Sequence, residues 1–149
     1  MKMITVTAIL GGEKELGQKV KSRIDFDALI KRGIPLGVIS HIKREFNLPD
    51  EVIARIIGVS PRTVSRRRRT VKIPAKERLS PVESDRVYRF ARIVAIAENV
   101  FEDKKEALEW LNNPQYGLGG RVPFDMLQTD AGAREVEELL LRIDYGVIS

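Results

Sequence analysis

Residues 50–69 read DEVIARIIGVSPRTVSRRRR, and this stretch limits the possible folds more than any other part of the chain. Apolar residues recur at helical spacing from Val52 to Ile57. Gly58 can adopt the left-handed conformation that ends a helix. Ser60 is a good N-cap, and Pro61 suits the first position of a second helix. The stretch therefore predicts two helices joined by a tight turn.

The order of small, turn-forming and polar residues in this stretch resembles the helix-turn-helix of phage-repressor-type DNA-binding proteins. The resemblance is carried by Ala54, by Gly58-Val59-Ser60 and by Thr63-Val64-Ser65-Arg66. Ala54 is small enough for the second helix to cross closely, and Val59 can fill the gap between the helices. The motif departs from the pattern at Arg67, where such motifs often carry an apolar residue.

The second predicted helix carries side chains suited to DNA. Residues near the N-terminus of such a helix face base edges in the major groove, and those positions are Arg62, Thr63, Ser65 and Arg66. The remaining basic residues are predicted to contact phosphates, and they are Arg67, Arg68 and Arg69. A basic run alone is also typical of a solvated helix end or a nuclear-import signal. The attached helix-turn-helix pattern favours DNA binding.

Charge is unevenly distributed along the 149 residues. Residues 1–78 hold 18 Lys and Arg against 8 Asp and Glu, a net charge of +10, whereas residues 79–149 hold 8 against 13, a net charge of −5. The front of the chain suits a polyanion, and the back would be repelled by one. This asymmetry indicates two functions in one chain.

Composition argues against several classes of chemistry. The chain has no cysteine, so it has no disulfides or thiol chemistry, and His41 is its only histidine. His-rich metal sites and most His-dependent catalytic arrangements are therefore not expected, and we predict no enzyme, cofactor, metal or catalytic residue. The opening apolar run is too short for a signal peptide and no later segment could span a membrane, so we expect a cytoplasmic protein.

The pattern of helix starts and breaks predicts an all-α protein in two parts. Residues 1–22 are a flexible arm or a dimerisation element, in which Ile4, Val6 and Ile9 could form a short strand. Residues 23–70 form the DNA-binding domain, and residues 71–79 form a linker. Residues 80–149 form a second helical domain, whose helices begin at Ser80, with a capping box to Glu83, and at Asp103 and Thr129.

Three glycines lie between Gln115 and Pro123. Leu118-Gly119-Gly120-Arg121 could in principle hold a phosphate, but no P-loop or dinucleotide fingerprint is present. A tight structural turn is the better interpretation, because glycine supplies the positive φ that turns need.

A set of short motifs runs through the back half of the chain: Arg78-Leu79-Ser80, Glu83-Ser84-Asp85-Arg86, Trp110-Leu111, Asn113-Pro114, Leu118-Gly119-Gly120, Pro123, Leu127, Thr129, Gly132 and Tyr145-Gly146. At these positions the back half is similar to the C-terminal domain of the Xre/MbcA/ParS antitoxin family. The helix-turn-helix of the front half matches the usual partner domain of this family. Together the two resemblances cover most of residues 25–149.

The resemblance implies an antitoxin of a type II toxin–antitoxin system, whose partner is a RES-domain toxin that consumes NAD. It also implies that the C-terminal end lies in or near the active-site cleft of the toxin. The residues that this points to are Arg121, Arg142, Tyr145, Gly146, Val147 and Ile148. Tyr145 and Val147 could instead fold back onto their own core. Trp110 could be an anchor that faces the partner, but it lies at helical core spacing with Ala107 and Leu111, which favours a core role.

The resulting hypothesis is an antitoxin that occludes the active site of its toxin and represses its own operon as a dimer on a palindromic operator. An alternative is a stand-alone phage-repressor-like regulator whose helical second domain only dimerises. A third reading, an enzyme acting on nucleic acid, has no metal cluster, nucleophile–base pair or phosphate loop in its support.

Overall fold

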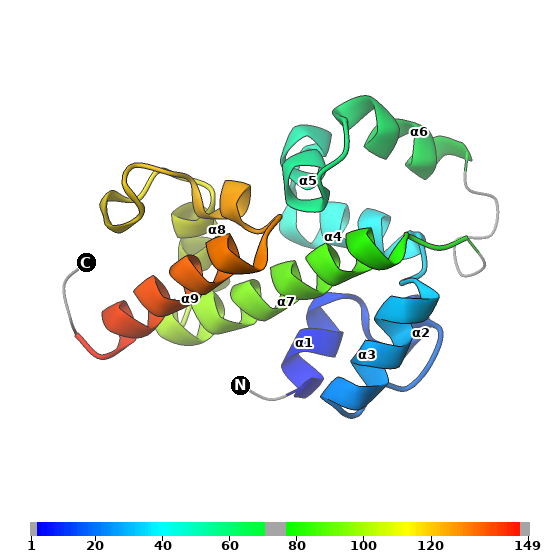
Figure 1. The fold of residues 1–149 in the computed structure, drawn as a ribbon, viewed down its shortest axis with the longest axis horizontal. Helices are drawn as coiled ribbons and strands as arrows, with labels where there is room; N and C mark the ends of the chain where they lie inside the picture. The colour runs from blue at the N-terminus through cyan, green and yellow to red at the C-terminus, as the bar shows by residue number, and fades with distance from the viewer. Residues whose placement is uncertain (1–2, 71–76, 147–149) are drawn as a thin grey trace.

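The computed structural model describes residues 3–70 and 77–146, and every regular element in these ranges is helical (Figure 1). The α-helices are α1 (Met3–Ile9), α2 (Gly12–Leu16), α3 (Arg23–Arg32), α4 (Gly37–Phe46), α5 (Asp50–Ile57), α6 (Pro61–Thr70), α7 (Pro81–Phe101), α8 (Lys104–Leu111) and α9 (Asp130–Asp144). Two short 3₁₀ helices, η1 (Tyr116–Leu118) and η2 (Pro123–Met126), lie between α8 and α9. The predicted all-α class is confirmed.

The helices of the back half begin where the capping residues predict. Ser80 accepts a hydrogen bond from the Glu83 N–H at 3.1 Å, and the Glu83 carboxylate accepts one from the Ser80 N–H at 2.9 Å. The Asp103 and Thr129 side chains cap α8 and α9 by accepting hydrogen bonds from the Glu106 N–H and the Gly132 N–H. These bonds satisfy N–H groups that a helix start leaves without partners.

The long helix α7 is the centre of the fold. It packs against α1, α3 and α5 on the front half of the chain and against α8 and α9 on the back half. Phe90 of α7 is fully buried, and its ring centroid lies 5.7 Å from that of Phe46 in α4 and 5.7 Å from that of Phe124 in η2. One hydrophobic core therefore joins the front half of the chain to the back half.

The short strand expected near Ile4, Val6 and Ile9 is wrong, because Met3–Ile9 is helix α1. Val6, Ile9 and Leu10 follow the i, i+3, i+4 spacing of a helix face and are buried, and α1 packs on α7. Leu16 of α2 is buried as well. This part of the N-terminal segment thus belongs to the core, while a role in dimerisation stays a prediction.

The end of the predicted linker is paired with the front half. The Leu36 N–H donates to the Glu77 carbonyl at 2.7 Å, and the Leu79 N–H donates to the Ile34 carbonyl at 2.8 Å. Gly33 has a φ of 105°, and a Cβ there would lie 2.4 Å from the Leu79 carbonyl oxygen. Glycine is therefore needed at this crossing. Residues 71–76 lie outside the described part of the chain.

None of the described helices combines the length and the apolar character needed to cross a membrane. Even α7, with 21 residues, carries acidic and basic side chains along its length.

Candidate functional site

The two helices α5 and α6 form the predicted helix-turn-helix. Gly58 takes a φ of 84° after α5, and its N–H donates to the Ala54 carbonyl at 2.7 Å. Ser60 Oγ accepts from the Thr63 N–H at 3.0 Å and lies 2.9 Å from the Thr63 hydroxyl oxygen. Val64 is fully buried beneath the turn. The local sequence therefore fixes how α6 is presented.

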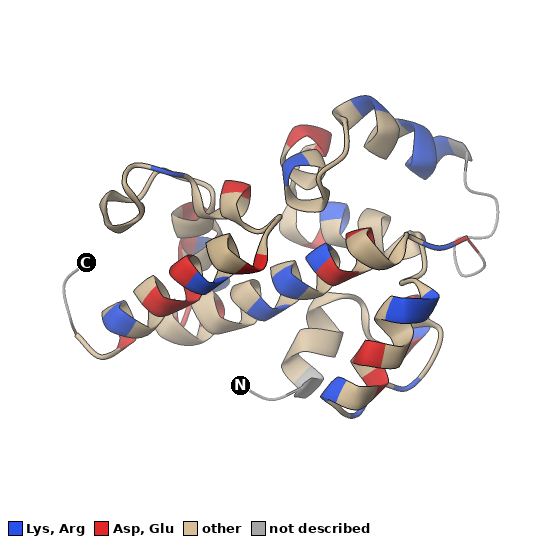
Figure 2. Ribbon diagram, in the orientation of Figure 1, with Lys and Arg blue, Asp and Glu red and all other residues tan. Residues whose placement is uncertain are grey.

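Helix α6 has two unlike faces. Arg62, Arg66 and Arg69 are exposed and recur at helical spacing on one side, which we call the arginine face. Thr63 and Ser65 are half-buried. Figure 2 shows that basic residues continue along α6 at one end of the molecule. This face presents the positive charge that a nucleic-acid backbone attracts.

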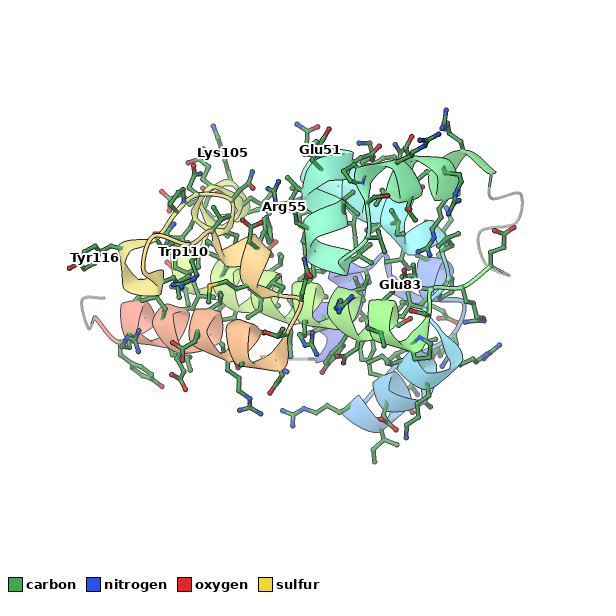
Figure 3. The ribbon with its side chains drawn as sticks, turned by 45° about the horizontal axis from the view of Figure 1, so that its top comes forward. Glu51, Arg55, Glu83, Lys105, Trp110 and Tyr116 are labelled. Atoms are coloured by element: carbon green, nitrogen blue, oxygen red, sulfur yellow. The ribbon has the colours of Figure 1, made fainter. Side chains whose placement is uncertain are left out.

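The other two arginines of α6 turn toward the protein. Arg67 Nη1 lies 2.8 Å from Glu83 Oε2 on α7, so a cation replaces the apolar residue usual at this position. Arg68 Nη2 lies 2.8 Å from Asp50 Oδ2 at the start of α5, where Lys43 Nζ is also 3.2 Å from Asp50 Oδ1. Glu83 lies on α7 below α6 in Figure 3.

Both acidic partners have a lowered pKa. For Asp50 the main cause is the hydrogen bond from Arg68, and Lys43 adds to it. Burial alone would raise the pKa of Glu83, but the hydrogen bonds from the Ser80 N–H and from Arg67 outweigh burial, so the pKa falls below its usual value. Both carboxylates are therefore ionised at neutral pH and hold their cations.

The glycine-containing segment after α8 is a closed turn. The Gln115 N–H donates to the Arg121 carbonyl at 3.1 Å, and the Gly120 N–H donates back to the Gln115 carbonyl at 2.9 Å. Arg121 Nη1 donates to the Leu118 carbonyl at 3.1 Å, inside the same turn. The backbone groups of the loop are thus used to close it, as the structural-turn interpretation expects.

Two tyrosines are exposed where this turn meets the end of α9, and we call this region the tyrosine end. Tyr116 of η1 is 90% exposed, and Tyr145 at the end of α9 is 79% exposed. Element η1 packs on α9, and Tyr116 points outward from the tip of the turn (Figure 3). The alternative in which Tyr145 folds onto the core is wrong.

The other residues predicted to contact the toxin have different surroundings. Arg121 and Gly146 are exposed, and Arg142 is half-buried. Val147 and Ile148 lie outside the described residues. Trp110 is only half-buried, and it packs against the edge of the core with its ring centroid 5.8 Å from that of Phe101.

Sequence reasoning missed Tyr116. It stands between Pro114 and Gly117, in a segment without helical periodicity, so no helix face was available to bury it. A large aromatic residue among turn-forming residues is a signal that could have identified it. Exposed tyrosines of this kind are enriched at protein interfaces.

The arginine face and the tyrosine end lie at opposite ends of α7 (Figure 1). Helix α6 is beside the N-terminal end of α7, whereas the turn after α8 and the end of α9 lie toward its C-terminal end. The 21 residues of α7 span about 30 Å at the α-helical rise. Two large partners could therefore be held without sharing a surface.

Polar contacts connect the helix-turn-helix to the back half between these two ends. Arg86 of α7 donates from Nη1 to the Ile57 carbonyl at 2.8 Å and from Nε to the Gln128 carbonyl at 3.2 Å. Gln128 Nε2 donates to the Arg55 carbonyl at 2.5 Å, and Arg55 Nε lies 2.6 Å from Asp125 Oδ1. The end of α5 is thus fixed to the segment before α9.

Comparison with known proteins matches both halves of the chain. Residues 25–92 match the antitoxin Xre-like helix-turn-helix domain, and residues 97–146 match the antitoxin Xre/MbcA/ParS C-terminal toxin-binding domain. An antitoxin Xre from Yersinia enterocolitica is 37% identical over 121 residues, which cover 80% of this chain and 78% of that protein. An antitoxin Xre from Photorhabdus laumondii is 33% identical and covers 83% and 80%.

A solved structure has a similar arrangement of helices. The match is to the crystal structure of the MbcT–MbcA toxin–antitoxin complex of M. tuberculosis, with a TM-score of 0.52 and 25% identity over 76% of this chain and 96% of that chain. The two domain matches, the curated relatives and this fold agree with one another. The chain therefore belongs to the Xre/MbcA/ParS family of antitoxins.

Proposed function

We propose that this antitoxin neutralises a RES-domain toxin that consumes NAD and also represses its own operon by binding operator DNA. The observation that carries the proposal is the pair of chemically unlike exposed surfaces at opposite ends of α7, one bearing arginines and the other tyrosines. A polyanion suits the first surface and a protein pocket suits the second. In this proposal the chain is a non-enzymatic regulator.

The arginine face supports the DNA-binding half of the proposal. A helix presented by a helix-turn-helix enters the major groove, where Arg62 and Arg66 can pair with guanine and Ser65 can bond a base or a phosphate. Arg69, further along the helix, is placed for a phosphate. Two copies of the chain as a homodimer would read half-sites about one helical turn of DNA apart.

The tyrosine end supports the toxin-binding half. Tyr145 and Tyr116 present large amphipathic rings to solvent. Arg121, in the same turn as Tyr116, and Arg142, three residues before Tyr145, would add polar contacts. Aromatic and Arg side chains carry much of the binding energy of protein interfaces. Residues 145–149 would block access of NAD to the active site of the toxin by steric occlusion.

Two separation-of-function variants test the proposal. The chain is co-expressed with the product of the adjacent gene, and growth, co-purification, NAD consumption and binding to the DNA upstream of the operon are measured. Arg62→Ala with Arg66→Ala should weaken operator binding by about 100-fold or more and leave neutralisation intact, since each base contact contributes about 1–3 kcal/mol. Deletion of residues 145–149 should do the reverse.

The outcomes also distinguish an antitoxin from a stand-alone repressor. A chain that binds operator DNA but neither co-purifies with the adjacent gene product nor rescues growth would be a repressor with a helical dimerisation domain. Equal damage to both activities by both variants would contradict the division of labour between the two ends.

A further inference from the structure

The run of arginines in α6 divides according to helix face. Val64 is fully buried, and Arg67 and Arg68 follow it by three and four residues, so they lie on the same inward side. Arg62, Arg66 and Arg69 occupy the exposed side. Adjacent arginines in the sequence therefore have different surroundings in the folded chain.

The inward arginines hold α6 to two other helices. Arg67 pairs with Glu83, whose side chain is only 11% exposed and which also caps α7. Arg68 pairs with Asp50 of α5, whose side chain is 20% exposed. Removing one of these arginines takes a charged partner from a largely buried carboxylate, although Lys43 Nζ still lies 3.2 Å from Asp50 Oδ1. Each arginine thus has a carboxylate to neutralise inside the protein.

We propose that Arg67 and Arg68 are positioning residues that fix α6 on α5 and α7, and that they do not contact DNA phosphates. The charge that meets DNA then comes from the arginine face. This inference rests on the proposed DNA-binding function and narrows its set of contact residues.

Salt dependence separates the two roles. A cation that neutralises a phosphate releases a counterion, so each phosphate contact adds about 0.9 to the slope of log K against log salt concentration. A cation that remains paired with a carboxylate of the protein adds nothing to this slope. Its loss weakens binding only through the position of α6.

The experiment compares Arg67→Met and Arg68→Met with Arg69→Met, a matched change on the exposed face. Binding to a DNA duplex of random sequence is measured over a series of salt concentrations. Arg69→Met should lower the slope by about 0.9. Arg67→Met and Arg68→Met should weaken binding, but their slopes should equal that of the unaltered chain. A slope lowered as much by the inward changes as by Arg69→Met would overturn the proposal.

Two provisions keep the test decisive. Should the methionine variants fail to fold, Arg67→Gln and Arg68→Gln, which keep a hydrogen-bond donor, replace them in the same measurement. A double-mutant cycle on thermal unfolding combines Arg67→Met with Glu83→Gln, because Gln can still serve the capping box.

The double-mutant cycle measures the Arg67–Glu83 ion pair in the absence of DNA. The loss of Tm in the double variant should be smaller than the combined losses of the single variants, and additive losses would overturn the positioning role of Arg67. If the unaltered chain bound no DNA at any salt concentration, the proposed repressor function would fail, and this cycle would still decide whether Arg67 positions α6.

Discussion

The arginine face and the tyrosine end differ in how their chemistry is distributed, although one core supports both. The arginine face spreads charge over Arg62, Arg66 and Arg69, and charge acts over several ångströms in water. The tyrosine end concentrates its apolar surface in Tyr116 and Tyr145. Contact of that kind needs a matching pocket, so a few residues carry most of the energy. A single substitution should therefore weaken binding moderately at the arginine face and strongly at the tyrosine end.

The largest expected effect tests whether the two surfaces depend on one core. Phe90→Ala should lower the free energy of unfolding by about 3–5 kcal/mol, because it removes the ring that contacts Phe46 on one side and Phe124 on the other. Chemical denaturation followed by circular dichroism and by the fluorescence of Trp110, the only tryptophan, measures this loss. The two signals should report one transition.

Val82→Ala is the control for this prediction. Val82 is 59% exposed at the start of α7, so its truncation should change stability by less than about 0.5 kcal/mol. Separate transitions for the two signals would show that the two halves unfold independently and would break the comparison.

The next effect concerns the tyrosine end. Tyr145→Ala and Tyr116→Ala should each weaken toxin binding by about 30-fold, which corresponds to roughly 2 kcal/mol for an aromatic anchor. Neither change should alter the Tm, because both side chains are largely exposed. Titration of the purified toxin with each variant gives the affinities.

Ile24→Ala serves as the comparison here, since Ile24 is 80% exposed on α3 in the front half of the chain. Its affinity for the toxin should equal that of the unaltered protein. If one tyrosine variant behaved like Ile24→Ala, that tyrosine would lie outside the interface.

Local signals predicted the elements around the arginine face. Gly58, Ser60 and Ser80 each act on the nearest turn of chain, so their spacing was sufficient to place helix ends and to find the helix-turn-helix. The all-α class followed from the same signals. The family of the back half followed from resemblance and is confirmed.

Long-range contacts were not predicted, because spacing along the chain does not encode them. Nothing in the run of arginines indicated that Arg67 would meet Glu83 or that Arg68 would meet Asp50. The packing of α1 on α7 was missed for the same reason, since a short apolar segment suits either a strand or a helix. The roles of the arginine face and of the tyrosine end remain predictions.

A smaller effect tests the contacts that connect the two ends. Arg86→Met should lower the free energy of unfolding by about 1–3 kcal/mol, because the Ile57 and Gln128 carbonyls lose a charged donor. Arg55→Met removes an exposed ion pair with Asp125 and should cost less than about 1 kcal/mol. Equal losses in the two variants would show that the Arg86 contacts do not hold the two halves together.

The smallest expected effect is a pH dependence of the Tm, caused by the carboxylates that pair with the inward arginines of α6. Asp50 and Glu83 have a lowered pKa in the folded chain, so their ion pairs stabilise it above the unfolded values of about 3.9 and 4.3. That stability is lost as the pH falls through the lower folded values. The Tm should therefore drop by a few degrees more on acidification in the unaltered chain than in a variant with Asp50→Asn and Glu83→Gln. The variant should start from a lower Tm at neutral pH and fall less steeply, because its two side chains no longer take up protons.

Parallel falls of Tm in the two proteins would mean that other carboxylates, such as Glu45 and Asp130, control acid unfolding. Asp50 and Glu83 would then not give the arginine face a sensitivity to acid that the tyrosine end lacks.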